Sequence, residues 1–399
     1  MFNKLTLDKT YQFLLVVLAF TIPLTVFGAN LIIVIICFIW LFSGDYKTKF
    51  DQIIDNKLLL ASIVFFCFHV VGLLWTENLA WGLHIVHKMW YFLLLLPILY
   101  TIVSSKYIKY YISAFLLAIS FTEVMSYLVW FEIVEPFKNA TVRNPTPFMS
   151  HISYNPILAF SIYLVMHKIF FDKNLSNLVF SLYSFFAVSM SINMFITGGR
   201  AGQVGFFVML SILIFQIFDR QRFKSFIAIV LIIPSIFISA YQFSDLFQER
   251  VDMAITETLN YSNTDGSSVG LRINFAINSW DVIKENPIIG IGTGDFPSEY
   301  YKINQINSPE LINATNPHNM YTLVLMQTGL LGLISMLGIF YYQIKLSFNS
   351  SNRFIRDVGI TLPLLFLVMM FSDSYLLGHY TTLMFVFFSS FLYKDFEES

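Results

Sequence analysis

One histidine stands where it could act as an acid or a base. His318 follows Asn316-Pro317, an order that predicts a helix with Asn316 as its N-cap and Pro317 at its first position. The positive end of a helix dipole favours a neutral imidazole, which is the form that a general base needs. A histidine that only forms hydrogen bonds at a membrane interface fits the same pattern equally well. His318 is therefore a candidate general base.

Two arginines stand where each could bind a phosphate. Arg200 ends the run TGGR, in which Gly198 and Gly199 let the backbone turn tightly and aim the guanidinium back toward neighbouring helices. Arg272 follows a pair of serines at the predicted start of a helix, where the helix N-terminus already favours an anion. A guanidinium can bind phosphate through two parallel hydrogen bonds. The plain alternatives are an arginine that reaches lipid headgroups and a solvated loop arginine.

Further ionisable side chains lie near the same predicted positions. Glu123 falls within an apolar run and Asp373 between two such runs, and carboxylates in such places usually pair with a basic group. Both are therefore predicted to support Arg200 or Arg272. Lys88 is a further candidate phosphate contact. No cluster of residues has the spacing of metal ligands, so we expect a site that uses no metal and no other cofactor.

The elements that must position these groups are apolar helices. Hydrophobic residues make up 56% of the 399 positions and charged residues only 12%, whereas soluble domains carry about 25% charged residues. The net charge of −1, without a clustered basic surface, argues against nucleic acid as a partner. Both cysteines, Cys37 and Cys67, lie in apolar runs, which argues against a disulfide framework. The composition is that of an integral membrane protein.

Apolar runs near the length that crosses a bilayer predict an all-α membrane protein of about twelve spans. The predicted spans are residues 11–27, 30–42, 58–74, 90–103, 109–131, 152–171, 177–196, 204–218, 226–243, 318–344, 358–372 and 375–393. They divide the chain into spans one to nine (1–243), a hydrophilic loop (244–317), and the last three spans with a tail (318–399). Within the loop, Leu271 to Lys284 carries apolar residues at helical spacing and predicts an amphipathic helix.

The lysines and arginines orient the predicted spans. With a cytoplasmic N-terminus, sixteen of the 24 fall in cytoplasmic segments and eight in outward-facing ones, four of them in the long loop, where the orientation rule has little force. Both termini are therefore predicted to be cytoplasmic, and the loop to face outward. Six of the seven histidines, with Arg200, Glu123 and Asp373, then lie in or near the outer half, so the site is predicted on the outer face.

Three stretches resemble the O-antigen ligase and polymerase superfamily, bacterial membrane enzymes that transfer glycans from a polyprenyl diphosphate carrier. They are TGGR at the end of a middle span, the outer loop with SSVGLRINFAINSW and NPIIGIGTGDF, and His318-Asn319 opening a span. The family's ligase pattern is His, then Asn, Ser or Gln, nine residues and Gly-x-x-Gly, and here it ends at Gly329 and Gly332. By their spacing alone, these two glycines are predicted to let a neighbouring helix pack closely. The usual first motif is closer to Thr-x-Ser-Arg, so Gly199 departs from it while the arginine is kept.

The resemblance implies a GT-C-like helical fold and an inverting, metal-independent glycosyl transfer on the periplasmic face of the bacterial inner membrane. It implies that Arg200 and Arg272 bind undecaprenyl diphosphate and stabilise the charge that develops as it leaves, while His318 takes the proton from the acceptor hydroxyl. Asn319 and Lys88 are expected to add substrate contacts. In the ligases the acceptor is the lipid A–core oligosaccharide. Membrane lipids are expected to surround the helices.

Other functions fit parts of the same pattern. A polysaccharide polymerase uses the same donor but adds the chain to another carrier-linked repeat unit, and a protein O-glycosyltransferase is a third possibility. A transporter of lipid-linked glycan belongs to a different class, in which internal repeats and charged groups near the midplane are typical. The ionisable groups here gather toward the outer face instead. The sequence therefore favours an enzyme, and among the enzymes an O-antigen ligase.

Overall fold

The described part of the chain is built from helices. The computed structural model describes residues 4–262 and 264–396, and within these ranges the β-pairing consists of one isolated bridge between Thr141 and Asn144. The predicted all-α class is therefore confirmed. Contacts between residues divide the chain into two compact units, which are described separately.

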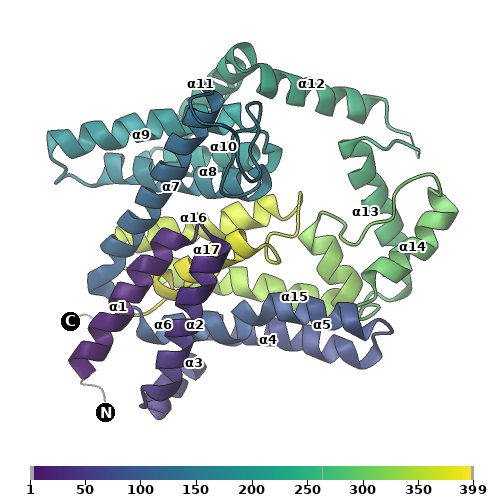
Figure 1. The fold of residues 1–399 in the computed structure, drawn as a ribbon, viewed down its shortest axis with the longest axis horizontal. Coiled ribbons are helices and arrows are strands. Elements are labelled where there is room, and N and C mark those ends of the chain that lie inside the picture. Colours follow the sequence, from purple (N-terminus) through teal and green to yellow (C-terminus); the bar gives the residue numbers. More distant parts are fainter. Residues whose placement is uncertain (1–3, 263, 397–399) are drawn as a thin grey trace. The chain divides into compact units, whose positions relative to one another are not determined.

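The first compact unit comprises Met1–Ile36 and Ser104–Asp252. Helix α8 packs against both α9 and α10, and α1 packs against α7 (Figure 1). Helices α8 and α10 approach closely at Gly202, which has no side chain. A Cβ added there would lie only 2.3 Å from the Cβ of Asn155. The helices are α1 (Lys4–Thr21), part of α2 (Val26–Phe42), η3 (Ser105–Tyr107), α7 (Ile108–Trp130), α8 (His151–Phe171), α9 (Asn177–Ile196), α10 (Arg200–Ile217), α11 (Arg222–Phe243) and part of α12 (Asp245–Leu259).

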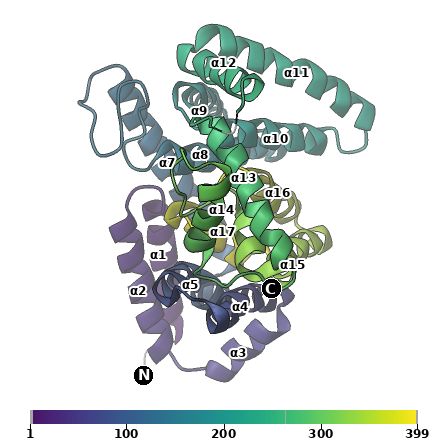
Figure 2. The ribbon, with the colours of Figure 1, turned by 90° about the vertical axis from the view of Figure 1, so that its right-hand side faces the viewer.

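The second compact unit comprises Cys37–Val103 and Met253–Ser399. Helix α15 packs along α4 and against α16, and α13 lies beside α14 (Figures 1 and 2). A single π-helical turn, η2, joins α5 to α6 without a break. Besides the ends of α2 and α12, the helices are α3 (Tyr46–Asp55), α4 (Lys57–Val71), η1 (Gly72–Trp75), α5 (Leu79–Trp90), η2 (Tyr91–Leu95), α6 (Leu96–Ile102), α13 (Ser268–Glu285), α14 (Phe296–Asn307), α15 (Met320–Asn349), α16 (Arg353–Met369) and α17 (His379–Leu392).

Many of these helices are long and apolar enough to cross a membrane. Within the described ranges eight pass by length and composition, or nine if α2 and α3, which meet at a bend of 116°, form one span. The protein is therefore a multi-pass membrane protein. Each predicted span coincides with a helix, but the count of twelve stays a prediction. Helix α17 has only 14 residues, and α16 carries three charged residues, Arg353, Arg356 and Asp357.

The fourth predicted span begins far from the start of its helix. The fourth span was predicted to start at residue 90, but the helix starts at Leu79, because His84, His87 and Lys88 interrupt the apolar pattern without interrupting the backbone. In the hydrophilic loop the predicted helix is confirmed as α13, capped by the Ser267 side chain, which accepts a hydrogen bond from a backbone N–H at 3.0 Å. The flanking helices α12 and α14 were not predicted.

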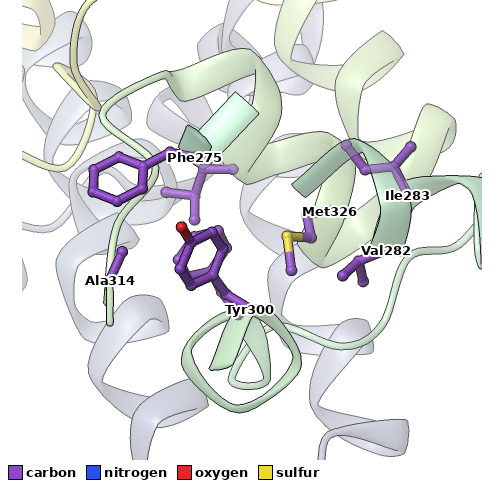
Figure 3. Close-up of a cluster of buried hydrophobic side chains, with 8 residues drawn as sticks. Phe275, Val282, Ile283, Tyr300, Ala314 and Met326 are labelled. Atoms are coloured by element: carbon purple, nitrogen blue, oxygen red, sulfur yellow. The ribbon is translucent and has the colours of Figure 1, made fainter. Parts of the chain in front are cut away.

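A buried apolar cluster joins the loop helices to α15. Phe275 of α13 and Tyr300 of α14 meet edge to face with ring centroids 5.7 Å apart, and Met326 of α15 lies beside them (Figure 3). Phe296 and Tyr300 are fully buried. The helices α13 and α14 are therefore packed on α15 through a hydrophobic core of their own.

Candidate active site

His318 lies in a tight turn that leads into α15. The helix begins only after Asn319, whose side-chain oxygen caps it by accepting a backbone hydrogen bond at 3.1 Å. The predicted N-cap at Asn316 and helix start at Pro317 are therefore wrong. His318 has a left-handed backbone with a φ of 50°. A non-glycine residue adopts such a conformation at a cost of about 1–3 kcal/mol, and it persists only where the surroundings enforce it.

The surroundings of this turn come from the segment before α17. The side-chain oxygen of Asn316 accepts hydrogen bonds from the backbone N–H of His318 and from the hydroxyl of Ser374, both at 2.9 Å. The side-chain amide of Asn319 donates to the carbonyl of Phe371 at 3.2 Å. The turn is thus clamped from both sides of His318, and this clamp accounts for the left-handed conformation.

Asp373 lies against the imidazole of His318. Its Oδ1 is 3.3 Å from Nδ1 and also accepts the backbone N–H of Ser374 at 2.7 Å. When the Nδ1 proton is directed to a carboxylate, Nε2 keeps its lone pair, and the carboxylate stabilises the imidazolium that forms on protonation. The His318 side chain is 43% exposed, so a ligand can reach it. The arrangement is that of a general base with an orienting carboxylate.

Helix α13 brings an aromatic ring and an arginine to the same turn. The ring of Phe275 stacks on that of His318, with centroids 6.1 Å apart and an interplanar angle of 23°. Arg272, one turn earlier on α13, lies close enough to the buried Tyr375 for its charge to act on that phenol. The second unit therefore gathers three predicted site residues, His318, Asp373 and Arg272.

A break in α15 anchors the loop in front of this site. The helix is interrupted at Gly329, where φ is 64° and ψ is −164°, and the segment 287–292, which we call the inserted segment, pairs with it across the break. A Cβ added to Gly329 would lie 2.2 Å from the carbonyl oxygen of Ile288. The predicted packing of a neighbouring helix at the two glycines is therefore wrong: Gly329 meets this segment, and Gly332 faces Thr328 of the same helix. The backbone hydrogen bonds are Ile291 N to Met326 O at 2.9 Å, Gly292 N to Gln327 O at 3.0 Å, Leu330 N to Pro287 O at 2.9 Å and Leu331 N to Ile288 O at 3.3 Å.

The chain beyond the inserted segment is tied to the connection between α4 and α5. The hydroxyl of Thr293 donates to the carbonyl of His69 at 2.7 Å. The carboxylate of Asp295 accepts the backbone N–H groups of Glu77 and Asn78 at 2.9 and 2.7 Å. Since α4 also packs along α15, these contacts make the loop part of one framework with the helix that follows His318.

Lys88 was predicted as a phosphate contact near an outer loop. The structure places it inside the continuous helical segment Leu79–Ile102 of the second unit. The contacts described above for the His318 turn come from α13, α15 and the segment before α17, and Lys88 is not among them. Its role as a substrate contact stays a prediction.

Arg200 lies in the first unit, at the first position of α10. The turn before it is held by two side-chain amides: the Thr197 hydroxyl donates to the buried Asn155 at 2.9 Å, and the backbone N–H of Gly198 donates to the half-buried Asn144 at 3.0 Å. A Cβ on Gly199 would lie 2.7 Å from the carbonyl oxygen of His151. The glycine that departs from the usual motif is thus required by the packing of α8 against this turn.

Glu123 lies buried in α7, also in the first unit. Neither of its carboxylate oxygens has a hydrogen-bond partner within residues 4–262 and 264–396. Its neighbours include Tyr127 and Tyr154, and Tyr154 in turn donates to Asn193 at 2.8 Å. The predicted support of an arginine by Glu123 stays a prediction.

Groups of acidic, histidine and cysteine side chains do not gather in the described ranges in a way that could hold a metal ion. The predicted metal independence stays a prediction, which the chelation of metals from an active preparation would test.

The fold and the site together define a multi-pass membrane protein with a histidine–carboxylate pair and arginines suited to an anionic substrate. Residues 185–337 match the family model described as O-antigen ligase, and this stretch contains Arg200, Arg272 and His318. This match covers that stretch of the chain and supports the resemblance to the O-antigen ligase superfamily, whose members are glycosyltransferase-like ligases and polymerases. The resemblance seen in the sequence is confirmed.

A protein of Haemophilus influenzae described as uncharacterized is similar to part of this chain. The two are 26% identical over 228 residues, which cover 53% of this chain and 55% of that protein. This chain thus spans about half the length of the curated relative that it matches.

Proposed function

We propose that this protein is an O-antigen ligase that transfers a glycan from undecaprenyl diphosphate to the lipid A–core oligosaccharide. The observation that carries the proposal is the pair of His318 and Asp373, whose Nδ1 and Oδ1 lie 3.3 Å apart. The His318 side chain is 43% exposed and lies within the stretch that matches the O-antigen ligase model. A positioned base of this kind suits the activation of a sugar hydroxyl.

The proposed reaction is a single displacement with inversion. The acceptor hydroxyl oxygen attacks the anomeric carbon of the donor glycan, and the bond from that carbon to the diphosphate oxygen breaks. The proton of the hydroxyl passes to Nε2 of His318, and Asp373 stabilises the imidazolium. The electron pair of the broken bond leaves with undecaprenyl diphosphate. Because no step needs an external Lewis acid, we propose that the transfer is metal-independent.

The arginines are proposed to bind the leaving diphosphate. Arg272 is held on α13, whose Phe275 stacks on His318, so this guanidinium belongs to the same small region as the base. Arg200 starts α10, where the helix N-terminus adds to its positive potential. A guanidinium fork that meets phosphate oxygens stabilises the charge as the bond breaks.

The proposed setting is the bacterial inner membrane, with both termini cytoplasmic, twelve spans in a GT-C-like arrangement, and the active site facing the periplasm. The excess of basic residues in the predicted cytoplasmic segments supports this orientation. Helix α11 is mostly apolar, and Ser225 is the one buried residue in it, which suits contact with membrane lipids.

Deletion of the gene tests the proposal through a gel profile of cell-surface lipopolysaccharide and carrier-linked glycan. A ligase predicts the loss of all capped lipopolysaccharide, with long glycan chains accumulating on the carrier. Cores capped with a single repeat unit would instead identify a polymerase. Carrier-linked glycan that accumulates on the cytoplasmic side would identify a transporter.

A further inference from the structure

A third arginine lies at the TGGR turn of the first unit. Arg250, on α12, places its guanidinium over Gly198, so that a Cβ added to that glycine would lie 3.7 Å from Nη2 of Arg250. The guanidinium also lies close enough to His151, at the start of α8, for its charge to act on the imidazole. The guanidinium of Arg250 therefore lies at the turn that ends in Arg200, next to a histidine.

The neighbouring acids do not neutralise Arg250. Glu249 forms an ion pair with Arg143, and the carboxylate of Asp252 accepts the hydroxyl of Tyr241 at 2.7 Å. Within residues 4–262 and 264–396, Arg250 has no hydrogen bond or ion pair of its own. A partly buried guanidinium without an acidic partner is stabilised when an anion joins it.

The position of Arg250 is fixed by packing rather than by charge. Phe247, one turn earlier on α12, packs edge to face on Phe195 of α9 with centroids 5.0 Å apart. The hydroxyl of Ser244 donates to the carbonyl of Phe195 at 2.7 Å. These contacts hold α12 on the end of α9, directly before the turn, so the guanidinium is presented there at little further cost in side-chain entropy.

We propose that Arg250 and Arg200 together bind the diphosphate group of the polyprenyl diphosphate carrier. This inference rests on the proposed function for the identity of the ligand, and it adds a residue outside the three sequence motifs. The cap of α10 is Gly199, which provides no side-chain hydrogen bond, so the first backbone N–H groups of α10 face the same place. Two guanidinium forks suit the adjacent charges of a diphosphate better than a single headgroup phosphate.

The test measures the binding of undecaprenyl diphosphate, without glycan, to the purified full-length protein. We expect Arg250→Gln to weaken this binding roughly tenfold or more, as for the loss of one charge-assisted phosphate contact, and Arg250→Lys to weaken it less. Arg222→Gln is the matched control, because it removes one exposed arginine from the same unit beyond the far end of α10, and it should leave the affinity within about twofold.

Competitors identify the source of the phosphate. Undecaprenyl monophosphate and phosphatidylglycerol vesicles should compete poorly with the wild type, and this preference for the diphosphate should vanish in Arg250→Gln. Equal weakening of all three ligands would overturn the proposal in favour of a general headgroup contact, and unchanged binding would overturn it outright. If Arg250→Gln does not fold, the Arg250→Lys variant provides the same comparison.

The binding assay also separates this inference from the proposed function. Arg250-dependent binding in a protein that transfers no glycan would refute the ligase and keep the diphosphate site. Normal transfer with binding that does not depend on Arg250 would refute the diphosphate site at Arg250 and keep the ligase.

Discussion

Replacement of Gly329 by alanine tests the way in which α15 holds the loop in front of His318. The backbone at this position has a φ of 64° and a ψ of −164°, a region essentially restricted to glycine, which costs an L residue about 1–3 kcal/mol. The new methyl group would also stand 2.2 Å from the carbonyl oxygen of Ile288, so the inserted segment must move away.

The size of the destabilisation follows from the hydrogen bonds that are lost when the inserted segment moves. Two hydrogen bonds, from Leu330 to Pro287 and from Leu331 to Ile288, lie directly at the contact, and each contributes about 1 kcal/mol. Backbone strain and lost hydrogen bonds together predict a destabilisation on the order of 3–5 kcal/mol. The thermal midpoint of the detergent-solubilised protein should therefore fall by roughly 5 °C or more.

Gly338→Ala is the matched control for this experiment. Gly338 lies further along the same helix, and an added Cβ meets nothing within 4 Å. Alanine there should be neutral or stabilising by up to about 1 kcal/mol, because it is the better helix former. Thermal unfolding of both variants decides the matter: equal midpoints for Gly329→Ala and the wild type would refute the account of the helix break.

Three further substitutions address the site. Arg200→Lys should not restore transfer, because lysine keeps the charge but loses the bidentate fork; near-normal activity would count against a diphosphate contact. His318→Ala should lower kcat on the order of 10²–10⁴-fold, and a loss of only a few-fold would remove it from the role of general base. Asp373→Asn should cost on the order of 10²-fold or more in kcat by releasing the imidazole, yet have little added effect in the His318→Ala background; additive losses would show that the two do not act as a unit.

The sequence predicted the helices better than their ends. Each predicted span was found from an apolar run, and α13 was found from apolar residues at helical spacing between Leu271 and Lys284, because these signals are local in the chain. The start of α15 was missed because both Asn316 and Asn319 are good caps. The choice between them is made by Ser374, 58 positions away, whose hydroxyl occupies Asn316.

The candidate site was predicted only in part, because some of its contacts join residues that are far apart in the sequence. Residue type, position next to predicted helix ends and the family resemblance marked His318, Arg272 and Asp373, which the structure gathers in the second unit. Phe275 gave no signal, since an aromatic residue at helical spacing is more often core, and its contact with His318 depends on the packing of α13 against α15. The break in α15 at Gly329 could not be predicted from the sequence either. Its partner Ile288 lies in a different part of the chain and forms no sequence pattern with Gly329.

The most direct test of the central claim is a transfer assay with the purified protein in vesicles, given undecaprenyl diphosphate-linked glycan and lipid A–core acceptor. We predict that wild-type protein produces capped lipid A–core and free undecaprenyl diphosphate, and that His318→Ala does so at least about a hundredfold more slowly while it still binds the donor. Transfer at the wild-type rate by His318→Ala would contradict the account, as would a wild-type protein that consumes no donor in the presence of acceptor.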